Sequence, residues 1–218
     1  MRHGLLVWTL LLVPAAACSS DAVASPEVSG VDRVLAQLKG IPQNGVTLGD
    51  PSAPAELVEF ADLQCPFCAR ANTQVLPPLV EKYVRTGQVK LVFRSLAFLG
   101  PDSVKAAHAA AAMGKQNHLW DFVELFFANQ GREGSGYVTD AFVQKLAAAV
   151  PGADVGRAMA QRNDAAVTSQ LDEAKAEARR LSVQGTPTFF LVKPGKPPKE
   201  LQPSSLTPEG FGRALIGL

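Results

Sequence analysis

The tetrapeptide Cys65-Pro66-Phe67-Cys68 follows the apolar stretch Glu56 to Ala61 (ELVEFA) and opens a segment with helical periodicity. A helix that begins here places Cys65 at its N-cap, where unpaired backbone N–H groups and the helix dipole favour the thiolate. The thiolate is the form that attacks a disulfide. Pro66 fits the first turn because it needs no N–H partner. Cys68, one turn further on, can resolve a mixed disulfide and should be the more buried thiol. The motif therefore predicts a redox-active pair.

Half of a zinc site is the main alternative for these two cysteines. Structural zinc is held by four thiolates or imidazoles. Only His108 and His118 remain as further ligands, and both lie in predicted helical segments. A disulfide that closes so short a loop would also constrain the unfolded chain very little. The pair is therefore predicted to serve reactivity, with no metal and no cofactor other than its own disulfide.

The N-terminus has the pattern of an export signal. Residues 1–17 combine a basic start, an apolar run of about nine residues and small residues before Cys18. The run is far shorter than the roughly 20 residues of a membrane-spanning helix. Two processing routes fit: lipidation of Cys18, as in bacterial lipoproteins, or ordinary cleavage, which would leave an unpaired exported cysteine. We expect the first route. The protein is then extracytoplasmic, in the periplasm or at the cell surface, and anchored by a lipid, with residues 18–44 forming a flexible tether and a short helix.

Charge and length limit the remaining possibilities. The chain has 21 basic and 20 acidic residues, and removal of residues 1–17 takes away Arg2 and no acid, which leaves a formal net charge of zero. No basic run is present, so nucleic-acid binding is not predicted. About 200 mature residues allow one domain with a sizeable core, or one domain with an insertion.

The order of the predicted elements indicates an α/β fold. The strand at Glu56 to Ala61, a helix that runs from the motif to about Thr86 with a kink at Pro77-Pro78, and a strand at Gln88 to Ser95 form a right-handed βαβ unit. Val46 to Leu48 is predicted to be an edge strand.

Beyond this unit, the signals from Pro101 to Ser182 are almost wholly helical. The chain then returns to strand at Thr188 to Val192, pairs back as a hairpin and ends in a helix capped by Thr207. We expect one domain formed by residues 45–98 and 184–218, with an inserted helical subdomain at residues 99–183.

A second motif, Gly185-Thr186-Pro187-Thr188-Phe189, runs directly into a predicted strand. A proline at this place can simply begin the strand. Together with residues 59–68 (EFADLQCPFC) and the helical insertion, however, the motif resembles the DsbA family of thioredoxin-fold oxidoreductases. The resemblance extends from about Gly45 to the C-terminus. It implies a thioredoxin-like fold with a helical insertion between its βαβ and ββα halves.

The resemblance also implies roles for individual residues. Cys65 would be the nucleophile and Cys68 the resolving cysteine. The loop Gly185-Thr186-Pro187 would carry a cis-proline that faces Cys65 and keeps the backbone of Thr186 free for a substrate peptide. Glu59 matches a buried acid that transfers protons near the buried thiol, although a carboxylate there can also face outward from the strand.

Two aromatic features follow from the same comparison. Trp120, Phe122, Phe126 and Phe127 resemble aromatic positions of the inserted helices, and we interpret them as ordinary core. Phe67 stands where the best-studied strong oxidants of the family carry histidine. Because phenylalanine adds no positive charge beside Cys65, we expect a less acidic thiol. We expect a reduction potential between about −270 and −120 mV, the thioredoxin and DsbA values.

Three functions remain open at this point. We expect an exported thiol:disulfide oxidoreductase that oxidises cysteine pairs in unfolded or reduced exported polypeptides and is reoxidised by a membrane redox partner. A reductase or isomerase would use the same cysteines, and a non-enzymatic binding or chaperone module would not use them. Dimeric isomerases of related fold carry an N-terminal dimerisation domain, and residues 18–45 are too few for one, so we expect a monomer.

Overall fold

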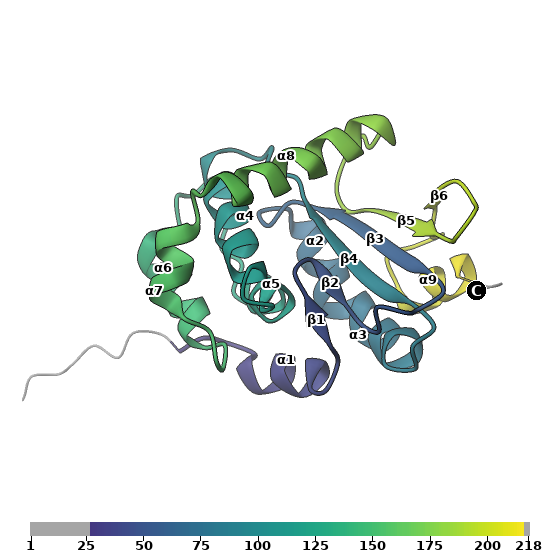
Figure 1. Cartoon of the computed structure of the whole chain (residues 1–218), viewed down its shortest axis with the longest axis horizontal. Coiled ribbons are helices and arrows are strands. Elements are labelled where there is room, and N and C mark those ends of the chain that lie inside the picture. The colour runs from purple at the N-terminus through teal and green to yellow at the C-terminus, as the bar shows by residue number, and fades with distance from the viewer. Residues whose placement is uncertain (1–26, 216–218) are drawn as a thin grey trace, which may run out of the picture.

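A mixed sheet of six strands forms the centre of the protein (Figure 1). The structure is a computed structural model that describes residues 27–215. In the sheet the strands lie in the order β1-β2-β4-β3-β5-β6. Their bounds are β1 (Gln43–Asn44), β2 (Thr47–Leu48), β3 (Glu56–Ala61), β4 (Lys90–Ser95), β5 (Thr188–Val192) and β6 (Lys199–Leu201). Only β3 and β4 run parallel, which confirms the predicted βαβ unit.

Strand β3 lies at the middle of the sheet, between β4 and β5. Glu56 pairs with Lys90 and Ala61 with Ser95 on one side, while Phe60 pairs with Thr188 on the other. Side chains alternate between the two faces along a strand. Both faces of the sheet are covered, so every β3 residue after Glu56 is buried.

A single helical stretch connects β3 to β4, and it is not a regular α-helix. It consists of α2 (Pro66–Arg70), the π-helical turn η1 (Ala71–Val75), α3 (Leu76–Leu79) and a second π-helical turn η2 (Val80–Val84). Pro77 and Pro78 lack the N–H groups that would bond the preceding turn. The wider turn η1 ends at Val75, with only Leu76 between it and this pair of prolines, and the chain accommodates both prolines without ending the helix.

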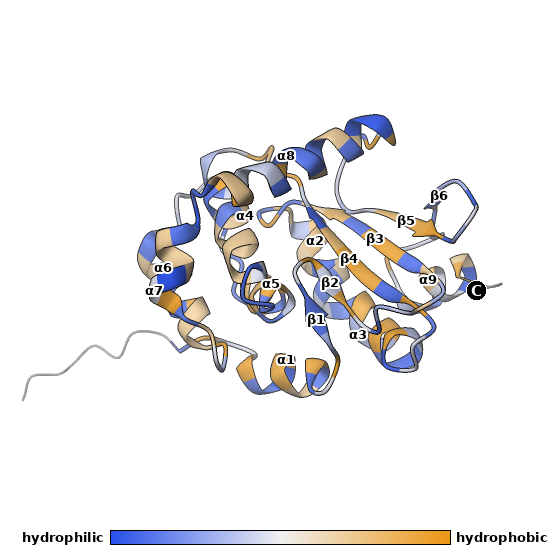
Figure 2. Ribbon diagram, viewed as in Figure 1, coloured by the Kyte–Doolittle hydropathy of each residue, from blue (hydrophilic) through white to orange (hydrophobic). Residues whose placement is uncertain are grey.

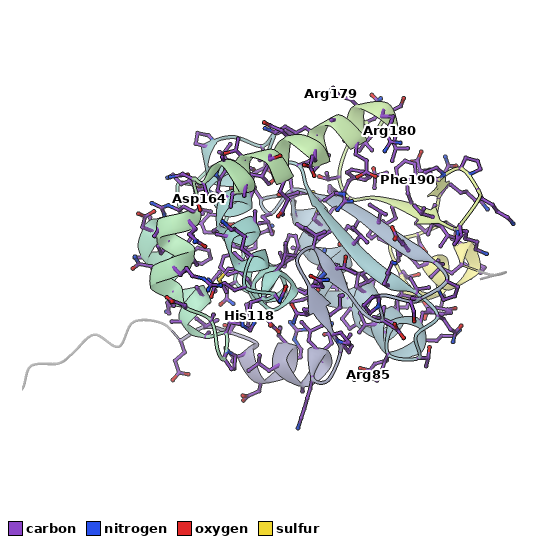
Figure 3. All side chains as sticks on the ribbon, in the orientation of Figure 1. Arg85, His118, Asp164, Arg179, Arg180 and Phe190 are labelled. Atoms are coloured by element: carbon purple, nitrogen blue, oxygen red, sulfur yellow. The ribbon has the colours of Figure 1, made fainter. Side chains whose placement is uncertain are left out.

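One face of the sheet is covered by α8 (Ala165–Arg180). Val58, Phe60, Val92 and Phe190 pack against Ala178 in a small apolar cluster. Arg94 and Glu177 join β4 to α8 by an ion pair of 2.6 Å. Figure 3 shows Phe190 at the sheet, whereas Arg179 and Arg180 project outward from the end of α8. Figure 2 shows the same division, with hydrophobic colours on β3, β4 and β5 and hydrophilic colours along much of α8.

The opposite face carries the larger core, which the connecting helix, the last helix and most of the insertion form together. The remaining helices are α1 (Val31–Leu38), α4 (Pro101–Gly114), α5 (Leu119–Ala128), α6 (Asp140–Ala148), α7 (Val155–Gln161) and α9 (Pro208–Ala214). Helix α5 packs against α1, α2, α4, α6 and η1. The four aromatic side chains interpreted as core are indeed buried there, Trp120, Phe122, Phe126 and Phe127.

Two details differ from the sequence prediction. Strand β2 is not an edge strand, because Gln43 and Asn44 form β1, which pairs with β2 and takes the edge. These two polar residues show no alternation and so gave no strand signal. Within residues 27–215, no helix is long and apolar enough to cross a bilayer. Cys18 lies outside the described residues.

Candidate active site

Cys65 is the N-cap of α2, and Pro66 occupies the first turn, as the motif predicted. The backbone at Cys65 is extended, with φ −71° and ψ 121°, so the chain turns from β3 into the helix at this residue. Cys65 keeps 5% of its surface exposed and Cys68 keeps none. Both thiols are free. Cys65 is therefore the slightly accessible cysteine and Cys68 the fully buried one, as the sequence predicted.

The loop before Cys65 is held by the buried carboxylate of Asp62. Its oxygens accept hydrogen bonds from the backbone N–H groups of Gln64 (2.8 Å), Phe98 (3.0 Å) and Leu99 (3.0 Å), and from the hydroxyl of Ser103 (2.7 Å). One side chain thus joins the reactive loop to the segment after β4 and to the first turn of α4.

Replacing Asp62 with alanine is expected to destabilise the protein by about 3–5 kcal/mol, because two buried and two partly buried hydrogen bonds lose their acceptor at once. Urea denaturation followed by circular dichroism measures the change. Asp50→Ala is the matched control, since Asp50 accepts two bonds from Ser52 at the surface and should leave the unfolding midpoint almost unchanged. Equal stability of the two variants would contradict the anchoring role of Asp62.

The helical insertion also holds the reactive loop. Gln130, two residues after the end of α5, donates from its amide to the carbonyl oxygens of Leu63 (2.7 Å) and Cys65 (3.2 Å). Gln64 accepts a bond from the backbone N–H of Gly134 at 3.0 Å. Residues almost 70 positions apart therefore fix the backbone on which Cys65 sits.

The loop before β5 lies directly against the reactive cysteine. The peptide bond between Thr186 and Pro187 is cis. The sulfur of Cys65 lies 3.4 Å from the carbonyl oxygen of Thr186, to which its S–H donates. The hydroxyl of Thr186 is buried and has no partner among the described residues. It is thus free to turn toward the Cys65 sulfur once that sulfur is ionised.

The surroundings of Cys65 stabilise its thiolate. A hydrogen bond from the Cys68 thiol is the largest influence, and the backbone N–H groups of Cys68 and Phe67 and the side chain of Thr186 act in the same direction. Burial acts against them, and the net effect lowers the pKa of Cys65 to about 6. At pH 7 the accessible sulfur is therefore mainly a thiolate, the nucleophilic form.

Cys68 has the opposite environment. Burial raises the pKa of its thiol far above the ordinary value, and the hydrogen bond to Cys65 and the negative charge of Glu59 raise it further. Its thiolate therefore forms only if a neighbouring group removes the proton as the sulfur reacts.

Glu59 is placed for that task. It lies on β3 with 1% of its surface exposed, so it does not face outward. Burial raises the pKa of its carboxyl to about 8. Asn72 of η1 donates to Glu59 Oε1 at 2.7 Å and to the carbonyl oxygen of Cys68 at 2.9 Å, so it holds the acid beside the turn that carries the buried thiol.

Two exposed aromatic side chains stand out among the described residues. Phe67, inside the motif, exposes 59% of its surface, and Phe98 exposes 55%. The backbone N–H of Phe98 bonds Asp62, three residues before Cys65, so both rings belong to segments that border the thiolate. An apolar surface beside a nucleophilic sulfur suits contact with an unfolded chain.

The structure adds residues that the sequence did not single out, namely Asp62, Asn72 and Gln130. The sequence offered a signal only for Asp62, which lies between an apolar-rich strand and the cysteine motif. Asn72 and Gln130 lie in helical or connecting segments where polar residues are common. No group of three or more His, Cys, Asp and Glu side chains within residues 27–215 is arranged to hold a metal.

Comparison with known proteins places this site in a family. The family model described as Thioredoxin matches residues 42–194, which is more than half of the chain. The probable disulfide bond formation protein D of Bacillus cereus is 30% identical over 148 residues, covering 66% of this chain and 68% of that protein. The disulfide bond formation protein D of Bacillus subtilis is 28% identical over 166 residues, covering 74% and 73%.

Solved structures show the same fold. BdbD from Bacillus subtilis, in its oxidised form, superposes with a TM-score of 0.68 at 23% identity, covering 79% of this chain and 94% of that one. DsbA from Chlamydia trachomatis gives a TM-score of 0.64 at 22% identity, covering 80% and 89%. A thioredoxin-like oxidoreductase from Silicibacter pomeroyi is 27% identical with a TM-score of 0.60, covering 78% and 88%. These likenesses confirm a thioredoxin-like fold with a helical insertion.

Proposed function

We propose that this chain, which belongs to the thioredoxin family and is a thiol:disulfide oxidoreductase of the DsbA type, oxidises cysteine pairs in exported polypeptides. The contrast between the two thiols carries this proposal. A Cys65 pKa of about 6 stabilises the reduced enzyme relative to its disulfide, because the dithiol form can ionise at neutral pH. Stabilisation of the reduced form makes a disulfide more oxidising. The value also lies between the thiol pKa values of thioredoxin, about 7, and DsbA, about 3.5.

The proposed reaction starts from the Cys65–Cys68 disulfide. A substrate thiolate attacks the sulfur of Cys65, the bond between the two cysteines breaks, and Cys68 leaves as a thiolate that takes a proton from Glu59. A second substrate thiolate then attacks the substrate sulfur bound to Cys65. The substrate disulfide forms, Cys65 leaves as a stable thiolate, and two electrons remain on the enzyme.

The loop Gly185-Thr186-Pro187 would receive the substrate backbone beside Cys65, and the exposed ring of Phe67 would contact its apolar side chains. The reduced pair would pass its electrons to a membrane redox partner. In that step Cys65 attacks the partner disulfide, Cys68 resolves the intermediate, and Glu59 accepts the proton. No cofactor other than the disulfide is needed.

Export, the lipid anchor at Cys18 and a monomeric state complete the proposal. The signal pattern of residues 1–17 supports the first two, and labelling with a radioactive fatty acid in a wild-type and a Cys18→Ser chain would detect the anchor.

Oxidative refolding of a reduced model protein tests the direction of the reaction. The oxidised enzyme is expected to restore native disulfides faster than buffer alone does. Its acceleration of refolding should be larger than its acceleration of insulin reduction by dithiothreitol. Faster insulin reduction without refolding activity would identify a reductase, and activity in neither assay would leave only a binding module.

A further inference from the structure

A second buried carboxyl group, Glu124 on α5, takes no part in the reaction described above. Only 2% of its surface is exposed, and its Oε2 has no hydrogen-bond partner among the described residues. Burial and then the negative charge of Glu59 raise the pKa of Glu124, Arg33 of α1 lowers it, and the net pKa is about 8. Two acids from distant parts of the chain therefore interact inside one core.

The polar atoms of this core have too few donors. Glu59 Oε2, Asn72 Oδ1 and Glu124 Oε2 are all buried, and none has a partner among the described residues. All three atoms are hydrogen-bond acceptors. Among these three groups, only a carboxyl that is protonated can supply a donor for one of these atoms. Since a partly satisfied buried network is costly, this set of atoms favours keeping a proton. A buried carboxyl that holds a proton in the same core as a redox thiol is suited to relay that proton.

Glu59 itself has no evident exit for a proton. It lies on the central strand, paired with Phe93 on one side and Phe189 on the other, and Asn72 of η1 covers its carboxyl. Glu124 is as buried as Glu59, but it lies on α5, whose last turn borders an opening at the surface. Helix α5 packs against η1 on one side and against α1 on another.

A depression opens at the end of α5 between η1 and α1. Its volume is about 480 Å³, and Arg33, Thr73 and Ala128 are among the residues that line it. Ala128 lies one turn after Glu124 on the same side of α5, and Thr73 is the neighbour of Asn72. Arg33 is the charged group at this opening, and it is exposed.

Helix α1 is fixed in this place. Arg85, labelled at the lower edge of Figure 3, donates to the carbonyl oxygens of Gln37 (2.7 Å) and Lys39 (2.9 Å) at the end of α1. At the other end, Ser29 donates to the side chain of Asn129 at 2.8 Å. The opening beside Arg33 is therefore part of the fold and not a gap beside a loose end.

We propose that Glu124 is the second member of a buried proton relay, which takes the proton of Cys68 from Glu59 and releases it at the depression beside Arg33. The proposal rests on the role of Glu59 proposed above. One proton moves and no electron does: Glu59 returns from acid to carboxylate, Glu124 becomes the acid, and water at the opening takes the proton. The path runs in reverse when Cys68 leaves as a thiolate. Glu124 acts through Glu59 and does not touch the reacting sulfurs.

Reoxidation of the reduced full-length protein by glutathione disulfide tests the relay, because the two steps of this reaction can be measured separately. Cys65 first forms a mixed disulfide, and Cys68 then resolves it and loses its proton. Glu124→Gln is expected to slow the second step by about tenfold, which is less than the effect expected for loss of Glu59 itself. The rate of Cys65 alkylation by iodoacetamide should stay within about twofold of the wild type.

The matched control is Asp121→Asn on the same helix. Asp121 is also buried, but its carboxylate is bonded to Gln43 (2.9 Å) and His118 (3.2 Å). In Asp121→Asn we expect the rates of both reoxidation steps to match those of the wild type. Arg33→Gln provides a second variant at an exposed position, where folding is not at risk. Loss of its positive charge should strengthen proton binding at Glu124 and slow the resolving step at pH 7.

A carboxyl titration by carbon-13 NMR of labelled glutamates separates a relay from a structural role. The pKa of Glu124 should fall in Glu59→Gln, because a neighbouring negative charge is removed, and should stay unchanged in Asp121→Asn. A slow resolving step in Glu59→Gln with normal rates in Glu124→Gln and Arg33→Gln would overturn the relay alone. Normal rates in Glu59→Gln as well would overturn the role of Glu59 on which it rests.

Discussion

Replacing Cys65 with serine is expected to reduce disulfide exchange to the uncatalysed background. A serine hydroxyl does not ionise at neutral pH and forms no disulfide, so neither substrate oxidation nor reoxidation can begin. Cys68→Ser should act differently, because the nucleophile remains while the resolving sulfur is lost. Mixed disulfides between Cys65 and substrate should then accumulate, as bands that disappear on reduction in a denaturing gel.

Cys18→Ser is the control for loss of a thiol in general, and it should retain full exchange activity. Oxidative refolding of a reduced model protein measures all three variants under the same conditions. Full activity in Cys65→Ser would refute every function in which this pair is the redox centre. Equal trapping by Cys65→Ser and Cys68→Ser would refute the assignment of Cys65 as nucleophile.

The segments that decide the fold were readable from sequence because each carries a short-range signal. Residues 56–61 are rich in apolar residues and predict a strand, and the observed β3 has the same bounds. Thr207 and Pro208 mark the start of α9, where the Thr207 hydroxyl accepts from the N–H of Gly210 at 3.2 Å. The position of Cys65 as N-cap follows from the same local rules.

The residues that hold the site by hydrogen bonds could not be predicted from the sequence, because their partners are distant along the chain. Asp62 becomes an anchor only when the N–H groups of Phe98 and Leu99 arrive beside it, and Gln130 acts across 65 residues. Asn72 lies in a π-helical turn, which no simple periodicity predicts. π-helical turns often occur at functional sites, and this one brings the Asn72 amide to both Glu59 and the Cys68 turn.

The effect of Phe67 could be predicted from the sequence only in part. The sequence predicted that loss of a histidine charge would leave Cys65 less acidic than in the strongest oxidants. A Cys65 pKa of about 6 agrees with that direction, and its first cause is the bond from Cys68, which does not depend on Phe67. The motif therefore tunes the thiolate through its own second cysteine, while Phe67 contributes an exposed apolar ring.

Glu59→Gln is expected to slow the Cys68-dependent resolving step by about 10²-fold, because the buried thiol loses its proton acceptor. Glutamine keeps an oxygen for the Asn72 amide, so the local hydrogen bond and the fold should persist. In the wild type the rate of this step should rise with pH as the Glu59 carboxyl ionises near its pKa of about 8. That inflection should be absent in the variant, and stopped-flow reoxidation between pH 5 and 9 measures both effects.

The same substitution should stabilise the protein at high pH. A carboxyl whose pKa rises from 4.5 to about 8 on folding holds its proton more tightly in the native state. Stability is therefore complete below pH 4.5 and falls as the pH rises toward 8. Glu59→Gln removes this loss, so at pH 9 it should gain roughly 3–5 kcal/mol over the wild type, with little difference at pH 4. Urea denaturation at the two pH values measures the gain, and equal stability at pH 9 would show that Glu59 is not held as a buried neutral acid.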